Sequence, residues 1–268
     1  SMVGSKPRLL LLNKADMADP SATSRWIAAY RKQGFVALGM DCRSGKGVSN
    51  FAPAVREQLL PALLEKRAAH GMTGAPIRLM VVGIPNVGKS SFSNRMAQSK
   101  RAKVEDRPGV TRTKQWVKIG SNMELLDMPG VLWPKFDDQT VAQKLAFTGA
   151  INDDVMDLEA LACLLLQRLA VSYPKALEER YRMTDLQAIQ EDGFAMLELL
   201  GRKRGMLISG GEVDTERAAK MLVGEFRASK WGRLSLERPP HRDTAEEGDD
   251  YAEDDFPEDD PDFTDDED

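Results

Sequence analysis

Apolar and polar positions in the first half of the chain form short blocks that predict strands separated by helices. Apolar runs without polar alternation are typical of strands buried in a parallel sheet, and they occur at residues 8–12, 35–40 and 77–82. Helical spacing predicts one helix that Ser21 or Thr23 caps and that ends near Lys32, and another at 50–69 with a kink at Pro61. Strands that alternate with helices favour an α/β fold with a parallel sheet.

The pattern changes near Thr140. Before that point, residues 115–119 and 123–126 flank Gly120-Ser121-Asn122, which is typical of a β-hairpin. After it, the periodic stretches predict helices at 141–147, 157–173, 174–182, 185–200 and 215–229. We therefore expect an α/β domain at 3–150, a small all-helical domain at 151–240 and a tail at 241–268.

Composition limits the class of protein. Apolar residues make up 42% of the 268 residues, which is enough to bury a core. The longest apolar stretches are far shorter than a membrane span, and no charged-then-apolar leader opens the chain. Cys42 and Cys163 cannot form a disulfide scaffold or a four-ligand zinc site, so we expect a reducing, cytoplasmic setting without a membrane.

Charge is distributed unevenly along the chain. Residues 241–268 hold 16 acidic side chains and one arginine, whereas residues 1–240 hold 26 acidic and 36 basic ones, a net charge of +10. A basic body indicates a polyanionic partner such as nucleic acid, and a self-repelling acidic tail is expected to be disordered. Two roles stay open for the tail: it solubilises the protein, or it competes with RNA for the basic body.

The strongest local motif is GIPNVGKS at residues 83–90, a Walker A pattern between a predicted strand and a predicted helix. The backbone N–H groups of such a loop and the positive end of the helix cradle phosphates. Lys89 is expected to reach the β- and γ-phosphates, and the Ser90 hydroxyl is expected to hold Mg²⁺. The alternative is a glycine turn that binds nothing, but the flanking strand and helix argue against it.

A second motif selects the base. Asn13-Lys14-Ala15-Asp16 follows the first apolar run and matches the Asn-Lys-x-Asp pattern of GTPases. The Asp16 carboxylate is expected to accept hydrogen bonds from N1 and N2 of guanine, which adenine cannot donate in that arrangement. The expected ligand is therefore GTP or GDP, which argues against other P-loop enzymes such as ATPases and nucleotide kinases.

The third motif, Asp127-Met-Pro-Gly130, follows a predicted strand and matches Asp-x-x-Gly. The Asp127 carboxylate is expected to hold Mg²⁺ through water, and the Gly130 amide to sense the γ-phosphate. A switch threonine is expected between this motif and the P-loop, with Thr111 as first choice and Thr113 as its rival. The predicted catalytic groups are therefore Lys89, Thr111 and Gly130.

The order of the motifs is unusual, because base recognition precedes the P-loop. Rejoining the ends of a sheet elsewhere keeps each motif at the carboxyl end of a parallel strand, so we predict a circularly permuted GTPase. The chain after Gly130 runs directly into the helical domain, so a γ-phosphate contact there could move that domain. Val131 cannot orient an attacking water, which predicts slow hydrolysis that a partner raises. His70 and His241 lie outside the motifs and are interpreted as bystanders.

Together these residues resemble the circularly permuted GTPases and, closely, the ribosome biogenesis GTPase A family. The resemblance extends from about residue 6 to 237 and is carried by the stretches KPRLLLLNKADMADP, VVGIPNVGKSSFSNRMA, DRPGVTRTKQWVKIG, LLDMPGVLWPKFDD, KRGMLISGGEVD and KWGRLSLE. It implies a protein that binds the precursor of the large ribosomal subunit and hydrolyses GTP late in its assembly. It also implies that the helical domain contacts RNA, and we expect this domain to be basic and the protein to be a monomer.

The resemblance adds residues to the expected site. Asn86 matches an asparagine linked to K⁺ in potassium-activated GTPases, where K⁺ stands in for an arginine finger, and Asp41-Cys42 falls where the family holds the guanine. The expected nucleotide contacts are Asn13, Lys14, Ala15, Asp16, Asp41, Cys42, Asn86, Val87, Gly88, Lys89, Ser90, Ser91 and Gly130. The expected metal ligands are Ser90, Thr111 and Asp127 for Mg²⁺ and Asn86 for K⁺.

The sequence also departs from the family pattern. Family members open with a segment that holds a strand, an Asp-Ala-Arg motif and a Trp-Phe-Pro-Gly-His stretch whose histidine is implicated in hydrolysis. Without that segment, we expect an open sheet edge and a catalytic group supplied from elsewhere. The alternative function is a non-hydrolysing, nucleotide-sensing RNA-binding scaffold, and a signalling GTPase is disfavoured because no lipidation motif is present. Candidate RNA contacts are Arg202, Lys203, Arg204, Lys220, Arg227, Lys230 and Arg233.

Overall fold

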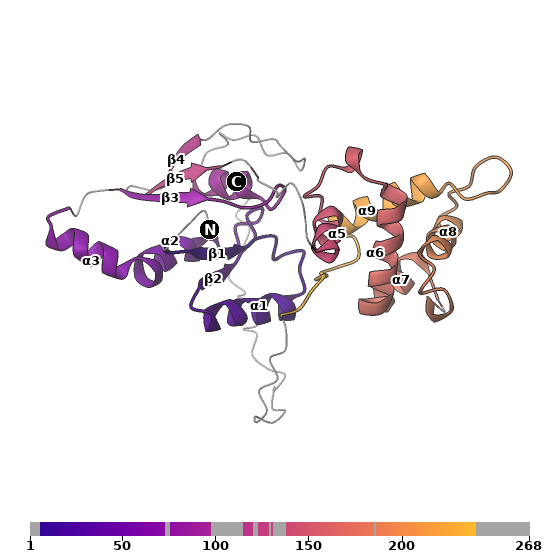
Figure 1. Cartoon of the computed structure of the whole chain (residues 1–268), viewed down its shortest axis with the longest axis horizontal. Helices are drawn as coiled ribbons and strands as arrows, with labels where there is room; N and C mark the ends of the chain where they lie inside the picture. The colour runs from indigo at the N-terminus through magenta and orange to yellow at the C-terminus, as the bar shows by residue number, and fades with distance from the viewer. Residues whose placement is uncertain are drawn as a thin grey trace, which may run out of the picture.

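The computed structural model describes residues 6–72, 76–97, 115–119, 123–128, 130, 138–184 and 186–239. The strands between residues 9 and 127 belong to an α/β part, which lies beside a helical part built from the helices between residues 139 and 227 (Figure 1). Each part has its own buried apolar core. Phe51 and Phe92 belong to the first core, whereas Phe147 and Leu165 belong to the second.

Two strands and the helix between them open the α/β part: β1 (Leu9–Leu12), α1 (Pro20–Lys32) and β2 (Val36–Gly39). The two strands pair in parallel. The residue that caps α1 is Asp19, whose carboxylate accepts a hydrogen bond from the N–H of Ser21 (2.8 Å). The expected cap at Ser21 or Thr23 is therefore wrong, because Pro20 opens the helix and Asp19 already satisfies the amides of its first turn.

The remaining strands are β3 (Ile77–Val81), β4 (Gln115–Ile119) and β5 (Met123–Asp127), and they lie in the order β3-β5-β4. β3 pairs with β5 in parallel, and β4 pairs with β5 in antiparallel fashion. The predicted hairpin of residues 115–119 and 123–126 is thus confirmed. The pairing places the carboxyl ends of β3 and β5 at the same edge of the sheet.

Within the described residues the strands form two sheets, whereas the sequence predicts one. The ladder between β1 and β2 does not extend to β3 in that part of the chain, so β1 and β3 each have one edge without a strand partner there. Residues of both strands line a single, mainly apolar cavity of about 1140 Å³. Apolar patterning identifies a buried strand, but it does not determine which strand becomes its neighbour.

The expected helix at 50–69 with a kink at Pro61 is not a single helix, although the chain does break next to Pro61. The chain forms a 3₁₀ turn (Val48–Asn50), α2 (Phe51–Pro53), a π-helical turn (Ala54–Leu59) and α3 (Pro61–Ala69). The break lies at Leu60, which has a φ of −122° and whose N–H donates to the carbonyl oxygen of Val55 (3.0 Å). Pro61 has no N–H with which to extend the helical ladder, so it begins a new helix instead of bending the old one.

Helix α4 (Lys89–Met96) follows the P-loop, and the helical part contains α5 (Gln139–Phe147), α6 (Leu158–Ser172), α7 (Pro174–Tyr181), α8 (Gly193–Lys203) and α9 (Thr215–Arg227). The expected helix at 185–200 is wrong at its start, since a 3₁₀ turn at Leu186–Ala188 precedes α8. Asp192 caps α8 by accepting from the N–H of Ala195 (2.9 Å). None of the described helices combines the length and apolar character needed to cross a membrane.

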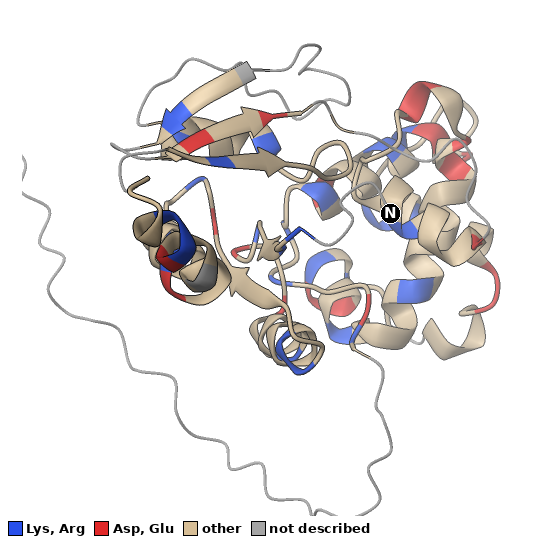
Figure 2. Cartoon of the chain, turned by 60° about the vertical axis from the view of Figure 1, so that its left-hand side comes forward, with Lys and Arg blue, Asp and Glu red and all other residues tan. Residues whose placement is uncertain are grey.

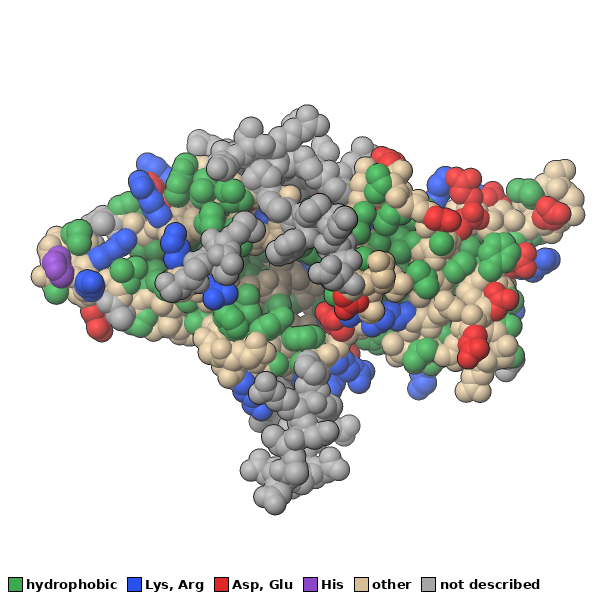
Figure 3. Space-filling view, viewed as in Figure 1, with side chains coloured by type: hydrophobic (Ala, Val, Ile, Leu, Met, Phe, Trp, Pro, Cys, Tyr) green, Lys and Arg blue, Asp and Glu red, His purple; other side chains and the backbone are tan. Residues whose placement is uncertain are grey.

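The positive charge of the body is concentrated in the α/β part. Residues 1–150 contain 23 basic and 11 acidic side chains, whereas residues 151–240 contain 13 basic and 15 acidic ones, a net charge of −2. Figure 2 shows how the charged residues are distributed over the ribbon, and in Figure 3 acidic side chains gather over the helical part. The expectation of a basic helical domain is therefore wrong. The net positive charge of residues 1–240 comes from residues 1–150 alone.

A polar network centred on Glu225 of α9 fastens the helical part. Its carboxylate accepts hydrogen bonds from Arg180 Nε (2.6 Å), Arg180 Nη2 (2.8 Å) and the Tyr181 hydroxyl (2.6 Å). The Arg204 guanidinium lies 3.6 Å away, and Trp231 Nε1 donates to the Tyr181 oxygen (2.7 Å). The bonds from Arg180 lower the pKa of Glu225 to about 2, against the opposing effect of burial.

Replacing Glu225 by Gln is expected to destabilise the protein by about 2 kcal/mol at pH 7, because Arg180 and Tyr181 lose a charged acceptor. The folded-state pKa of about 2 lies below the ordinary value of 4.5. The carboxylate's contribution is therefore complete above the ordinary value and is lost as the pH falls from there towards 2. Urea unfolding at pH 7 and pH 3 measures both effects.

The matched control is Glu216→Gln on the same helix, which removes an exposed pair with Lys220 and is expected to leave the free energy of unfolding unchanged. If Glu225→Gln differs from the unaltered protein by the same amount at pH 7 and pH 3, the charge of Glu225 does not contribute as described.

Candidate functional site

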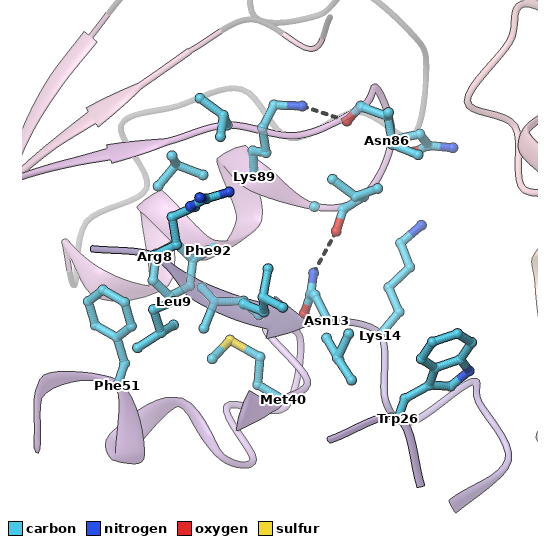
Figure 4. A pocket seen from close by; sticks show the side chains of 18 of the residues that line it. Arg8, Leu9, Asn13, Lys14, Trp26, Met40, Phe51, Asn86, Lys89 and Phe92 are labelled. Carbon is cyan, nitrogen blue, oxygen red and sulfur yellow. Dashed lines mark hydrogen bonds between the residues drawn. The ribbon is translucent and has the colours of Figure 1, made fainter. Parts of the chain in front are cut away.

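The P-loop connects β3 to α4, and its own lysine folds back over it. Gly88, the N-cap of α4, has a φ of +90°, which residues with a side chain rarely adopt. The buried Lys89 donates from Nζ to the carbonyl oxygen of Ile84 (2.7 Å; Figure 4). Ser90 and Ser91 follow in the first turn of α4 and are half-buried. A lysine ammonium and a helix N-terminus in one loop are suited to binding phosphate.

Asn13 connects the base-recognition motif to the P-loop. Its Nδ2 donates to the carbonyl oxygen of Val87 (2.8 Å), and its Oδ1 accepts from the N–H of Cys42 (3.2 Å; Figure 4 shows the first bond). A Cβ on Gly88 would lie only 2.3 Å from Asn13 Nδ2, so this approach requires glycine. One side chain therefore holds together the ends of β1 and β2 and the P-loop.

Lys14 and Asp16 lie in a tight turn at the carboxyl end of β1. Lys14 has a φ of +59°, and its carbonyl oxygen accepts from the N–H of Met17 (2.9 Å). The N–H of Ala15 donates to the carbonyl oxygen of Met40 (3.1 Å), which holds the turn against the end of β2. The Asp16 side chain is exposed, so its carboxylate can accept hydrogen bonds from a base placed beside the P-loop.

Asp127, the last residue of β5, is a buried carboxylate next to the P-loop. Asp127 is only 2% exposed, and its Oδ1 has no hydrogen-bond partner within the described residues. Burial raises the pKa of Asp127, while the hydroxyls of Ser93 and Ser90 and the charge of Lys89 oppose that effect. Mg²⁺ prefers oxygen ligands, and the buried Asp127 Oδ1 is such an oxygen, with the Ser90 hydroxyl close by. The residues present therefore fit this metal.

The Lys89 ammonium is held in an unfavourable environment. Burial lowers the pKa of Lys89, and the charge of Asp127 acts in the opposite direction. A phosphate beside the ammonium would favour its charged form in the same way as Asp127 does. The site therefore favours an anionic ligand.

Gly130 packs directly on the P-loop. A Cβ at this position would lie 2.8 Å from the backbone N and Cα of Pro85 and 2.9 Å from Lys89 Nζ. Only a bare backbone fits in this space. The structure thus brings Lys89, Asp127 and Gly130 together at the ends of β3 and β5.

Asp41 and Cys42 shape the loop after β2. The Asp41 carboxylate accepts from the N–H groups of Arg43 (2.7 Å) and Ser44 (3.0 Å). Burial acts to raise the pKa of Asp41, but the hydrogen bonds from Ser44 and Arg43 outweigh it and lower the pKa. Burial, together with the charge of Asp41, raises the pKa of the Cys42 thiol to about 11. Both side chains are buried, so any contact of Asp41 or Cys42 with guanine would come from the backbone.

Asn86 points away from the Lys89 ammonium (Figure 4). Its φ is +61°, and its Nδ2 donates to the carbonyl oxygens of Thr148 and Gly149, each at 3.4 Å. Arg227 of α9 donates to the carbonyl oxygens of the two residues before them (2.8 and 3.1 Å). The P-loop asparagine is thus linked to the end of α5, where the helical part begins.

Several expected residues lie outside the described residues, namely Thr111, Thr113, Val131 and His241. His70 is exposed at the end of α3, and its Nδ1 lies 2.7 Å from the carbonyl oxygen of Lys66. In Figure 1, α3 lies at the end of the α/β part that is farthest from the helical part.

Arg233 contacts the base-recognition loop, which its sequence position does not predict. The sequence analysis places it among the candidate RNA contacts, but its guanidinium donates to the carbonyl oxygens of Ala15 (2.8 Å) and Ala18 (3.0 Å). A spacing of 218 residues separates Arg233 from Ala15, and periodicity carries no information over that distance. The only signal in the sequence that this arginine has a role is the stretch KWGRLSLE, which is one of the stretches that carry the family resemblance.

A P-loop after β3, an acidic residue at the end of β5 and an Asn-Lys-x-Asp turn beside them define a P-loop GTPase, and a family model described as 50S ribosome-binding GTPase matches residues 78–190. The chain is 42% identical to ribosome biogenesis GTPase A of Priestia megaterium over 238 residues, covering 89% of this chain and 82% of that protein. It is 29% identical to the protein of the same name from Thermotoga maritima, with coverage of 87% and 77%. The chain belongs to the ribosome biogenesis GTPase A family.

Solved structures agree with this assignment. The GDP-bound structure of TM YlqF matches with a TM-score of 0.58 at 27% identity, covering 86% of this chain and 83% of that one. The GNP-bound structure of YlqF from T. maritima matches with a TM-score of 0.52 at 26% identity, with coverage of 86% and 81%. The fold is thus that of the nucleotide-bound YlqF structures, and membership of the family makes this chain a GTP hydrolase of ribosome biogenesis.

Replacing Gly130 by Ala is expected to lower the affinity for GTP by at least about tenfold, because the new Cβ must displace the Pro85 backbone or the Lys89 ammonium. Titration with a fluorescent GTP analogue measures this effect, and thermal unfolding checks that the protein still folds.

Gly224→Ala in α9 is the control, since a Cβ there meets nothing within 4 Å and alanine is the better helix former. Wild-type GTP affinity in Gly130→Ala would show that the contact with Pro85 does not matter for binding.

Proposed function

We propose that this protein hydrolyses GTP on the precursor of the large ribosomal subunit, late in the assembly of that subunit. The observation that carries the proposal is the meeting of three motifs, since Asn13 bonds the P-loop at Val87 and Gly130 packs on Pro85. The ribosomal setting is supported by the names of the relatives and by the description of the matching family model.

The order of the elements supports a circularly permuted GTPase domain at 3–150, because the base-recognition turn follows β1 and the P-loop follows β3. The separate apolar cores support a helical domain at 151–240, although Phe147 packs with the helical core and so assigns the end of α5 to that side. The acidic tail expected at 241–268 lies outside the described residues.

Each group in the site has a proposed role. Asp16 accepts the N1 and N2 protons of guanine, Lys89 balances the charge of the β- and γ-phosphates, and the Gly130 amide contacts the γ-phosphate. Mg²⁺ would be held by Ser90, Thr111 and Asp127 and would neutralise phosphate charge.

The P-loop asparagine is the proposed K⁺ ligand. Its amide nitrogen already donates to Thr148 and Gly149, so this role falls to its amide oxygen. K⁺ would supply a positive charge near the γ-phosphate, where other GTPases use an arginine finger. Because Val131 cannot orient water, we propose that the ribosomal particle raises a slow intrinsic rate.

Charge locates the RNA-binding surface. Residues 1–150 carry 12 more basic than acidic side chains, so we propose that the α/β part makes most of the contacts with rRNA. In the helical part, Arg204, Lys220, Arg227 and Arg233 bind groups of the protein itself, and the remaining candidates, Arg202, Lys203 and Lys230, are exposed. The acidic tail competes with RNA for the α/β part, and the protein acts as a cytoplasmic monomer.

Replacing Asp16 by Asn is expected to convert the base preference from guanine to xanthine, because the amide donates where the carboxylate accepted. GDP affinity should fall by about a hundredfold or more, while XDP affinity rises. Competition between GDP and XDP for a fluorescent nucleotide measures the change. Unchanged GDP binding in this variant would show that the turn at 13–16 does not read the base.

The function itself is tested by GTP turnover with and without large ribosomal subunits, first in potassium and then in sodium. Subunits are expected to stimulate turnover by about tenfold or more, and potassium to exceed sodium. Absence of turnover under all four conditions, despite tight and guanine-selective binding, would favour a nucleotide-sensing RNA-binding scaffold. Equal rates in potassium and sodium would remove the role proposed for Asn86.

A further inference from the structure

The segment Gly232–Glu237, called the strap below, leads from the end of the helical part back to the α/β part. In Figure 1 it is the part of the chain after α9 that reaches α1. The strap bonds to two regions that are far apart in the sequence. One is the base-recognition loop near the start of the chain, and the other is α6 in its second half.

On the α/β side, the strap bonds the backbone that follows the base-recognition motif. Arg233 donates from Nη2 to the carbonyl oxygen of Ala15 (2.8 Å) and from Nε to that of Ala18 (3.0 Å). The N–H of Leu234 donates to the carbonyl oxygen of Met17 (3.0 Å). Asp16 therefore lies between two residues whose carbonyl groups are both fixed by the strap.

On the helical side, the strap is bonded to α6 and the residue that follows it. The Tyr173 hydroxyl accepts from the N–H of Ser235 (3.0 Å) and donates to the carbonyl oxygen of the same residue (3.0 Å). Arg168 Nη2 donates to the carbonyl oxygen of Leu236 (2.7 Å). The strap is thus fixed at both of its sides by hydrogen bonds.

We propose that Arg233 is a positioning residue for guanine recognition and that the strap couples the helical part to the base-recognition loop. This inference rests on the proposed role of Asp16. A loop at the surface loses conformational freedom when it binds a base, and a planar guanidinium that already holds two of its carbonyl groups reduces that entropic cost. In this proposal Arg233 acts through the backbone on either side of Asp16 and not through a contact with the nucleotide.

The coupling has a consequence for regulation. A partner that shifts α6 also shifts the strap, and the strap changes the position of the carboxylate that reads the base. Binding at the helical part would therefore change the affinity for guanine nucleotides without contacting the nucleotide.

The experiment compares the affinities of Arg233 variants for GDP and IDP, because inosine lacks the 2-amino group that Asp16 is proposed to bind. Arg233→Ala is expected to weaken GDP binding by about five- to tenfold and IDP binding much less, so the GDP/IDP ratio falls. Arg233→Lys keeps the charge with one donor group and should restore part of the ratio. Arg217→Ala, which removes an exposed arginine of α9, is the matched control and should leave both affinities unchanged.

Tyr173→Phe tests the coupling from the helical side, because it removes the bonds to Ser235 and leaves those to Ala15 and Ala18 in place. It is expected to lower the GDP/IDP ratio by a smaller factor than Arg233→Ala. An unchanged ratio in this variant would restrict the inference to Arg233 and overturn the coupling.

The outcomes separate this inference from the proposed function. If Arg233→Ala weakens GDP and IDP equally, or neither, the positioning role is wrong. If Asp16→Asn loses GDP while Arg233→Ala keeps its GDP/IDP ratio, guanine recognition stands and only the inference fails. If Asp16→Asn itself keeps GDP, the proposed base site fails first.

Discussion

The nucleotide site depends on the side-chain amide of Asn13. Within the described residues β1 is not paired with β3, so the sheet that carries the base-recognition turn and the sheet that carries the P-loop share no backbone ladder. Asn13 bridges them by donating to Val87 and accepting from Cys42. Only an amide supplies a donor and an acceptor at that length: a carboxylate would leave the Val87 carbonyl without a donor, and leucine would leave both groups unpaired.

The P-loop is also tied to the helical part. The C-terminal end of a helix presents carbonyl groups without helical partners and a partial negative charge. At the end of α5, Asn86 takes two carbonyl groups, while Arg227 takes the two before them and pairs with Asp153 (2.7 Å). A change at Asn86 therefore reaches α9 across one helix end, without a long chain of contacts. The strap makes the second connection, so the helical part contacts both the phosphate side and the base side of the site.

Local features of this protein could be predicted from the sequence, but contacts between distant segments could not. The strands at 8–12 and 77–82 and the hairpin at 115–126 follow from apolar periodicity and turn residues, and the P-loop follows from its spacing. The division into two sheets, by contrast, depends on which strand edges meet, and Arg233 became a candidate RNA contact because an isolated arginine carries no sign of its acceptors. The prediction of a helix at 185–200 was wrong at its start because Asp192 caps a new helix and Gly193 packs closely against Cys163. These local contacts outweigh the apolar spacing.

The burial of two opposite charges explains why the site needs its ligand. Desolvation lowers the pKa of Lys89 and raises the pKa of Asp127, so burial disfavours the charged form of each group, and their mutual attraction offsets only part of that effect. A phosphate gives Lys89 a partner, and a divalent cation gives one to the buried oxygen of Asp127. Both charged forms would be stabilised fully only when nucleotide and metal are bound together. Gly130 packs on the same loop through Pro85, and Asn86 of that loop bonds the end of α5, so a change at Lys89 has a short path to the helical part.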